Sequence, residues 1–327
     1  MLIYLARRLA NYAVLLIIAI TLAYIIASVA LNPLAVFDWT NPSLDRGSIL
    51  RTLTDYNINP NDPVLSRFGN WAHGVLTSWD WGRDPKGASV NDEVAVRIWV
   101  SVRLITIATF VGMFGGVALG AWSAVKKGRP ADKGISIFAL IFISTPPMVL
   151  AVVLQILAVK FNQATGTNFF EFIGETGNIG NYPGAWLVDR LQHLLLPTLS
   201  LSLMHIATYS RYQRNLMLDT LGADYVRTAR AKGLTAGKAI RKHALRNALI
   251  PMATYFAFAI TGVVLGATIT EQVFGWHGFG IYGVQSITQQ DINGTVAVVA
   301  FSGVCVLLGA LLSDILVAIV DPRVRTN

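Results

Sequence analysis

The sequence predicts an all-α polytopic membrane protein with six transmembrane helices, and three observations support this prediction. Only 13% of the 327 residues are charged and 54% are hydrophobic, whereas soluble domains carry about 25% charged residues. The apolar residues form long runs, which is the pattern of helices that cross a bilayer. Lys and Arg gather in alternate connecting segments. This composition excludes a disordered or fibrous chain and an ordinary soluble enzyme of two domains.

Six apolar runs approach or exceed the length of about 20 residues that a membrane-spanning helix needs. They are 9–31, 104–125, 134–159, 194–209, 248–270 and 295–320. Pro146 and Pro147 lie in the middle of the third run and are expected to kink or break it. The first run has a stretch resembling a signal-peptide cleavage site, but it is too long for a signal peptide, so we expect a retained anchor.

The distribution of basic residues predicts the orientation in the membrane. Lys and Arg precede the first run, fill the segments between the second and third and between the fourth and fifth runs, and return in the tail. The segment between the fifth and sixth runs holds Glu271 and Asp291 but no Lys or Arg. Because cytoplasmic segments are enriched in Lys and Arg, both termini are expected to be cytoplasmic. The net charge of +8 is therefore a topology signal and not a nucleic-acid footprint.

The runs lack the side chains that other classes of membrane protein, such as ion-driven carriers, need for their function. The second, third and fifth runs contain no Asp, Glu, Lys, Arg or His, which disfavours an ion-driven secondary carrier. His205 is the one candidate in mid-span, and a packing histidine is favoured there over a proton relay. The single cysteine, Cys305, excludes a disulfide framework and a multi-cysteine metal site. No phosphate-binding loop is present, so any ATP would be bound by another chain.

Gly112, Gly116 and Gly120 repeat every four residues along the second run. Such a row lets two helices approach closely. The sequence leaves two interpretations open, namely packing within the chain and an interface with another subunit.

The segment between the fourth and fifth runs predicts a helix, a glycine turn and a second helix. Asp219 or Thr220 could cap the first helix, and Gly233 is expected to end it. Leu221, Tyr225 and Ala229 would share one face of this first helix, with Arg227 and Arg230 turned away.

Thr235 would cap the second helix, whose apolar side would carry Ile240, Ala244 and Leu245, and Pro251 would open the fifth run. A membrane-surface anchor for acidic lipid is one interpretation. A docking element for a cytoplasmic partner is favoured, because an anchor needs charge but not this capped pattern.

Residues 224–234, followed by 243–251, resemble the cytoplasmic-loop motif of ABC importer permeases, most closely those of the dipeptide, oligopeptide and nickel group. Residues 80–83 resemble that group's short glycine signature, and 271–280 its outer turn. Asp314 together with 321–325 resembles its closing segment. The four stretches occur in the family's order along nearly the whole chain.

The chain departs from the family pattern in its inner motif and in its outer turn. The general importer motif begins Glu-Ala-Ala, where this chain has Arg227, Thr228 and Ala229. The outer turn has His277 and Gly278 in place of the usual Pro-Gly. A metal-binding role for His277 is conceivable, but a solvated turn residue is the favoured interpretation, and no metal ligand is assigned.

The resemblance implies a type I ABC importer permease fold and the first of two paired permease subunits. Residues 1–95 would form the first transmembrane helix and a long extracytoplasmic loop, 96–321 the permease core with a coupling loop at 211–247, and 322–327 a short tail. The implied ATPase-docking residues are Asp224, Tyr225, Arg227, Thr228, Ala229, Arg230, Lys232 and Gly233.

The resemblance also implies the function and the partners. The chain would form the path for di- or oligopeptides, with nickel or glutathione import as the alternative and a stand-alone carrier or channel less favoured. Its partners would be a second homologous permease, two cytoplasmic ABC ATPase subunits that bind ATP and Mg, an extracytoplasmic substrate-binding protein and membrane lipid. The chain itself would be no enzyme, with no catalytic residue and no cofactor, in a bacterial or archaeal cell membrane.

The segment 32–103 contains a further helical pattern. Apolar residues from Val64 to Leu76 follow i, i+3, i+4 spacing. Trp71, Trp79, Trp81 and Trp99 suit the headgroup level of a bilayer. An interfacial helix is favoured over a docking surface for the binding protein. The acidic residues of this segment could attract cationic substrates, although solubility explains them equally well.

Overall fold

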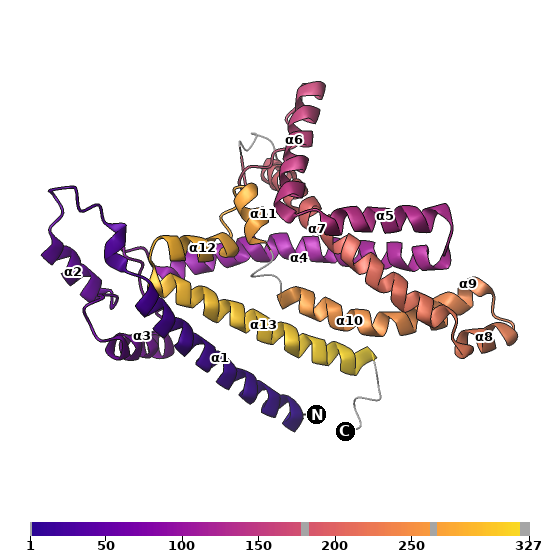
Figure 1. The fold of residues 1–327 in the computed structure, drawn as a ribbon, viewed down its shortest axis with the longest axis horizontal. Coiled ribbons are helices and arrows are strands. Elements are labelled where there is room, and N and C mark those ends of the chain that lie inside the picture. The colour runs from indigo at the N-terminus through magenta and orange to yellow at the C-terminus, as the bar shows by residue number, and fades with distance from the viewer. Residues whose placement is uncertain (1, 178–182, 262–266, 321–327) are drawn as a thin grey trace. The chain divides into compact units, whose positions relative to one another are not determined.

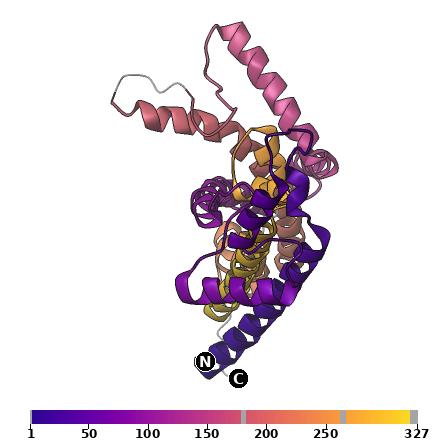
Figure 2. The same cartoon turned by 90° about the vertical axis from the view of Figure 1, so that its left-hand side faces the viewer.

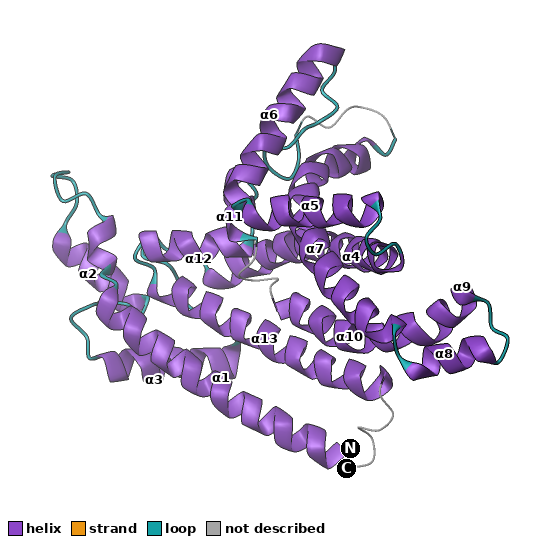
Figure 3. Cartoon of the chain, turned by 45° about the vertical axis from the view of Figure 1, so that its right-hand side comes forward, coloured by secondary structure: helices purple, strands orange, loops and turns teal. Residues whose placement is uncertain are grey.

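A computed structural model describes residues 2–177, 183–261 and 267–320. Helices dominate these residues, and no strand is drawn among them (Figure 3). The all-α prediction is therefore confirmed. Four helices of the described part are long and apolar enough to cross a membrane, namely Arg7–Ala30, Val90–Val125, Pro147–Thr165 and Ile292–Leu312.

The six expected runs all fall on helices wherever they are described. The first lies in α1 (Leu2–Ala30), the second in α4 (Val90–Val125) and the sixth in α13 (Ile292–Val320). The third is divided between α5 (Pro130–Ser144) and α6 (Pro147–Thr165), because the chain is extended at Thr145 and Pro146. The break expected at Pro146 and Pro147 is thus confirmed.

The fourth run lies inside the much longer α7 (Ala185–Leu221). The fifth is represented by α10 (Arg246–Thr261) and α11 (Thr268–Val273), with residues 262–266 outside the described part. Pro251 lies inside α10 and does not open it, so that expectation is wrong. Asp314 has no described side chain, and residues 321–325 lie outside the described residues.

The chain divides into two compact units, the first formed by Met1–Ser101 with His277–Leu307. This unit contains η1 (Pro33–Val36), α2 (Arg46–Asp55), α3 (Val64–Ser78) and α12 (Phe279–Thr288), besides α1 and the starts of α4 and α13. α3 packs against α1 (Figure 1, Figure 2). The helix expected at 64–76 is therefore confirmed.

Aromatic rings hold the first unit together. Tyr24 of α1 contacts Trp71 of α3, with ring centroids 5.1 Å apart, and Trp81 contacts Phe301 of α13 at the same separation. Trp71 and Trp81 are buried in this packing, so these two side chains contact the chain itself. Trp79 and Trp99 are exposed, and a headgroup position for them stays a prediction.

The second unit is formed by Val102–Trp276 and the chain from Leu308 onward. It contains α5, α6, α7, α10 and α11, together with α8 (Asp224–Ala231), α9 (Ala236–Ala239) and the π-helical turn η2 (Ile240–Leu245). α7 is its central helix, because α5, α6, α10, α11 and η2 all contact it.

The glycine row on α4 lets this helix pack tightly on α7. A Cβ atom on Gly112 would collide with the Cβ atom of His205, and one on Gly120 would collide with the Ser210 carbonyl. A Cβ atom on Gly116 would lie 2.7 Å from the Tyr209 Cβ atom and 3.0 Å from the Ile206 carbonyl oxygen. Of the two interpretations left open, the structure therefore supports packing within the chain, and His205 serves that packing.

Candidate functional site

The connection between α7 and α10 is an ordered chain of short helices. α7 continues through Asp219 and Thr220 to Leu221, so neither residue caps the next helix. α8 begins at Asp224 with Ala223 in the N-cap position, and only Gly222 and Ala223 separate it from α7. The start predicted for this helix was therefore wrong by about one turn.

Gly233 ends α8 as the sequence predicts. Its φ angle is +91°, in the left-handed region that glycine adopts without a steric penalty. The Gly233 amide donates to the Arg230 carbonyl at 3.0 Å, and the Leu234 amide donates to the Ala229 carbonyl at 3.2 Å. This pair of hydrogen bonds is a Schellman motif, which satisfies the last carbonyls of the helix.

The second helix begins at the expected residue. Thr235 occupies the N-cap position of α9, and the Ala239 amide donates to the Thr235 carbonyl at 2.9 Å. The Thr235 side chain itself makes no capping hydrogen bond. α9 leads through η2 directly into α10, so the connection returns to the bundle without a flexible break.

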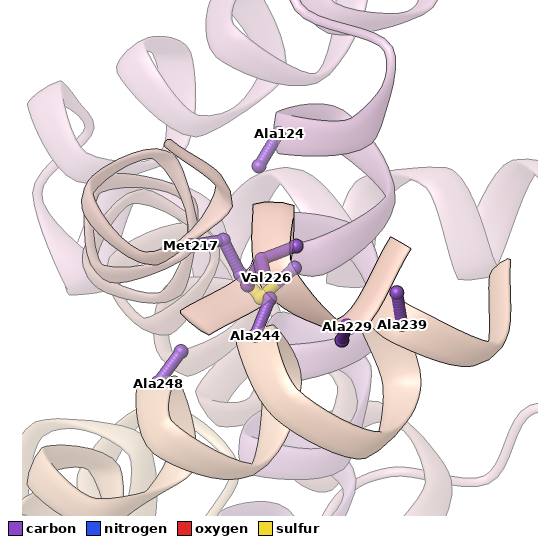
Figure 4. Packing of buried hydrophobic residues seen from close by; sticks show 7 residues of the cluster. All are labelled: Ala124, Met217, Val226, Ala229, Ala239, Ala244 and Ala248. Carbon is purple, nitrogen blue, oxygen red and sulfur yellow. The ribbon is translucent and has the colours of Figure 1, made fainter. Parts of the chain in front are cut away.

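A cluster of small buried side chains fixes this connection to the bundle (Figure 4). We call it the alanine cluster. Its members are Ala124 of α4, Met217 of α7, Val226 and Ala229 of α8, Ala239 of α9, Ala244 of η2 and Ala248 of α10. Leu221, Leu234, Ile240 and Leu245 pack around it. Because five of its seven members are alanines, the backbones of six elements can approach one another closely.

The cluster divides the predicted docking residues into two groups. Ala229 is 7% exposed and faces the alanine cluster, so its side chain contacts this chain and not a partner. The remainder are exposed, namely Asp224, Tyr225, Arg227, Thr228, Arg230, Lys232 and Gly233. The apolar face expected from Tyr225 is instead provided by Val226, which lies three residues before Ala229.

The exposed face of α8 carries both signs of charge but no strong ion pair. Asp224 stands at the N-terminus and Arg230 in the last turn, where each favours the helix dipole. Arg227 Nη1 lies 3.9 Å from Asp224 Oδ1, with the two side chains 76% and 97% exposed. A pair that is so exposed contributes little to stability, so these side chains remain available to a partner.

A second exposed surface lies beside the first. Leu234, Lys238, Arg241 and Lys242 line an open hollow of about 330 Å³. Its three cations point to an anionic neighbour such as a lipid headgroup. The connection thus presents a mixed α8 face and a basic hollow.

An ion pair that was missed in the sequence lies at the same end of the bundle. Asp132 of α5 accepts two hydrogen bonds from Arg214 of α7, from Nε at 2.7 Å and from the terminal nitrogen at 3.0 Å. Ser123 Oγ donates at 2.5 Å and the Gly128 amide at 2.9 Å to the same carboxylate. The side chain of Asp132 is only 5% exposed. The Arg214 guanidinium holds the pKa of Asp132 well below its usual range.

Comparison with known proteins identifies the type of molecule that carries this arrangement. Residues 116–326 match the family described as the binding-protein-dependent transport system inner membrane component. The chain belongs to this family. The matched region begins in the glycine row of α4 and includes the whole alanine cluster, the Asp132–Arg214 pair and the exposed face of α8.

Named relatives of this permease match along most or nearly all of the chain. It is 45% identical to the oligopeptide transport system permease protein OppB of Mycobacterium tuberculosis, over 99% of both chains. It is 31% identical to the oligopeptide permease protein AppB of Bacillus subtilis, over 98% of this chain and 99% of that one. The dipeptide permease protein DppB of Bacillus subtilis is 30% identical, over 82% of this chain and 81% of that one.

A solved structure shares the fold of this permease. The inward-facing MetNI methionine ABC transporter matches with a TM-score of 0.51 and 19% identity, over 70% of this chain and 96% of the matched chain. The chain is a membrane-spanning permease subunit of an ABC importer, as the resemblance predicts. Its family forms the membrane component and is not itself catalytic.

Proposed function

We propose that this chain is the first of two paired permease subunits of an ATP-driven peptide importer. The observation that carries the proposal is full-length similarity to relatives named oligopeptide permeases, at 45% and 31% identity. Di- or oligopeptides are the proposed substrates, delivered by an extracytoplasmic binding protein. Nickel or glutathione remains the alternative cargo.

In this proposal two cytoplasmic ATPase subunits bind ATP and Mg, and a second homologous permease completes the path. Residues 1–95 form the first transmembrane helix and extracytoplasmic loop, 96–321 the permease core, and both termini are cytoplasmic. The enrichment of basic residues in alternate segments supports this orientation.

The α8 face is the proposed ATPase-docking surface. It is exposed, mixed in charge and fixed from behind by the alanine cluster. Docking would therefore depend on Asp224, Tyr225, Arg227, Thr228, Arg230 and Lys232 by direct contact. Ala229 and Gly233 would act indirectly, by holding α8 and its terminal turn in place.

The experiment is co-purification of the two ATPase subunits with variants of the full-length chain. Thr228→Trp adds bulk to the exposed face without touching the cluster, and we expect it to abolish ATPase recovery and peptide uptake in vesicles. Reversal of Arg241 and Lys242 to Glu alters only the basic hollow and should retain the ATPase. If the charge-reversal variant loses the ATPase while Thr228→Trp still co-purifies with it, the basic hollow acts as an electrostatic anchor and the α8 face is not the docking surface.

Uptake itself tests the wider proposal. Proteoliposomes with both permeases, the ATPases and the binding protein should import peptide only when ATP is supplied. Peptide import by the permease alone, or without ATP, would refute an ATP-driven importer and favour a carrier or channel.

A further inference from the structure

A trio of metal-ligating side chains lies where the α6–α7 connection meets α7. Glu171 belongs to that connection, and Asp189 and His193 stand one turn apart on α7. One ligand atom from each residue lies within 4.8 Å of the other two. The side chains of Asp189 and His193 are 5% and 4% exposed, whereas Glu171 is 32% exposed.

The imidazole of His193 is held in an orientation suited to a metal ligand. Its Nδ1 atom lies 2.8 Å from the Asp189 backbone carbonyl, which can only accept a hydrogen bond and therefore requires a proton on Nδ1. In the neutral ring Nε2 then carries the free lone pair. A hydrogen bond from the other ring nitrogen to a carbonyl is the usual support of a metal-bound histidine.

The Nε2 atom faces a carboxylate at a suitable separation. It lies 3.7 Å from Glu171 Oε2, which is close to the roughly 3.3 Å between neighbouring ligands of a tetrahedral zinc ion. A Cβ atom on Gly177 would lie 2.8 Å from Glu171 Oε2 and 3.2 Å from His193 Nε2. The absence of a side chain at Gly177 therefore leaves the space between the two donors open.

Asp189 supplies an independent observation. Its Oδ1 atom accepts a hydrogen bond from the Gly177 amide at 2.9 Å. Its Oδ1 atom also lies 3.5 Å from His193 Nδ1, whereas its Oδ2 atom is buried and has no hydrogen-bond partner within the part of the chain that the structure describes. An unsatisfied buried carboxylate oxygen is costly unless a cation or donor compensates it.

We propose that Glu171, Asp189 and His193 bind a divalent first-row transition-metal ion, with zinc as the test ion. Two carboxylates balance the charge of the ion, and the set of one nitrogen and two oxygens suits zinc with one position open to solvent. Binding joins the α6–α7 connection to α7. This inference goes beyond the proposed transport function and does not depend on it.

The test measures zinc affinity of the full-length chain in detergent, by competition with a fluorescent chelator, and records the absorption spectrum of the cobalt-loaded protein. We expect one zinc ion per chain, with at least a tenfold loss of affinity in Glu171→Gln, Asp189→Asn and Gly177→Ala. Even the loss of an outer-shell partner commonly costs about 10-fold to 100-fold. Gly177→Ala removes no donor and only fills the space.

Glu175→Gln is the matched control. Glu175 lies in the same connection but pairs with Arg103 and Arg190 at 2.6 Å and 3.9 Å, so its variant should keep wild-type zinc affinity. Because the Glu171 side chain is 32% exposed, Glu171→Gln is the variant least prone to unfolding. The proposal would be overturned if the wild-type chain bound zinc no more tightly than Glu171→Gln, or if Gly177→Ala kept wild-type zinc affinity. The three side chains would then form only a hydrogen-bonded cluster.

Discussion

Gly116→Ala tests whether the glycine row of α4 serves packing inside the chain. The added Cβ atom would meet the Tyr209 Cβ atom at 2.7 Å, the Ile206 carbonyl oxygen at 3.0 Å and the Ser210 amide nitrogen at 3.1 Å. Carbon atoms pack best at about 3.5–4.0 Å, so α4 and α7 would have to separate by roughly 0.8 Å. No flexible side-chain end is among the three neighbours, so side-chain rotation gives no relief.

The expected magnitude combines two opposing effects. Overpacking of a tight interface costs about 1–3 kcal/mol, and the rigid neighbours favour the upper end. Alanine in a helix interior gains about 1 kcal/mol over glycine. We therefore expect Gly116→Ala to lower the free energy of unfolding by about 2 kcal/mol.

Gly134→Ala on α5 is the matched control. A Cβ atom there has nothing within 4 Å, so the variant keeps the helix-propensity gain without the clash and should be neutral or slightly more stable. The assay is denaturation of the full-length chain in detergent, followed by tryptophan fluorescence. If Gly116→Ala is as stable as wild type but no longer associates with the second permease, packing within the chain is refuted and the glycine row forms a subunit interface.

Three further predictions concern single residues. Asp132→Asn should lower the free energy of unfolding by about 2 kcal/mol, which is less than the 3–5 kcal/mol for breaking a fully buried pair because Arg214 is 25% exposed. Because the pKa of Asp132 is depressed, the carboxylate stabilises the fold at every pH above the ordinary carboxyl pKa. Unfolding assays should therefore give a constant stability difference between wild type and variant from pH 5 to 8, and this difference should shrink in strong acid. Gly233→Val should cost about 1–2 kcal/mol in the left-handed turn and speed proteolysis after α8, whereas Gly233→Asn should stay near wild type. Burial raises the pKa of Asp291 to about 7, so the folded state keeps this proton at pH values where the unfolded chain has lost it. Stability should therefore fall as the pH rises from about 4 to 7, and melting curves of Asp291→Asn should lose that pH dependence.

The sequence predicted the helices well because bilayer length and apolar runs leave little freedom. The break at Pro146 and the end of α8 at Gly233 followed from local chemistry alone, since proline lacks an amide donor and glycine adopts a positive φ. Errors arose where tertiary packing overrides a local signal. Asp219 and Thr220 have side chains typical of helix caps. However, Met217 belongs to the alanine cluster and Leu221 packs against it, so α7 continues past Asp219 and Thr220.

Side-chain partners distant in sequence could not be predicted. Asp132 and Arg214 are 82 residues apart, and the local sequence around each residue gives no sign of its partner. The spacing of Asp189 and His193 is readable as one turn of a helix, but the approach of Glu171 depends on the path of the α6–α7 connection. Val226 was missed because Tyr225 matched the expected apolar spacing, although its polar hydroxyl and larger ring favour the exposed position.

The arrangement around α8 favours rigid transmission of movement between a docked partner and the bundle. Only Gly222 and Ala223 separate α8 from α7, and η2 leads without interruption into α10. The alanine cluster joins α8 to α4, α7 and α10, and the Asp132–Arg214 pair joins α5 to α7 one turn away from Met217. Packed interfaces of this kind resist continuous deformation. A force on the exposed α8 face would therefore displace α7 and its neighbours together, as the proposed coupling of ATPase closure to reorientation of the permease requires.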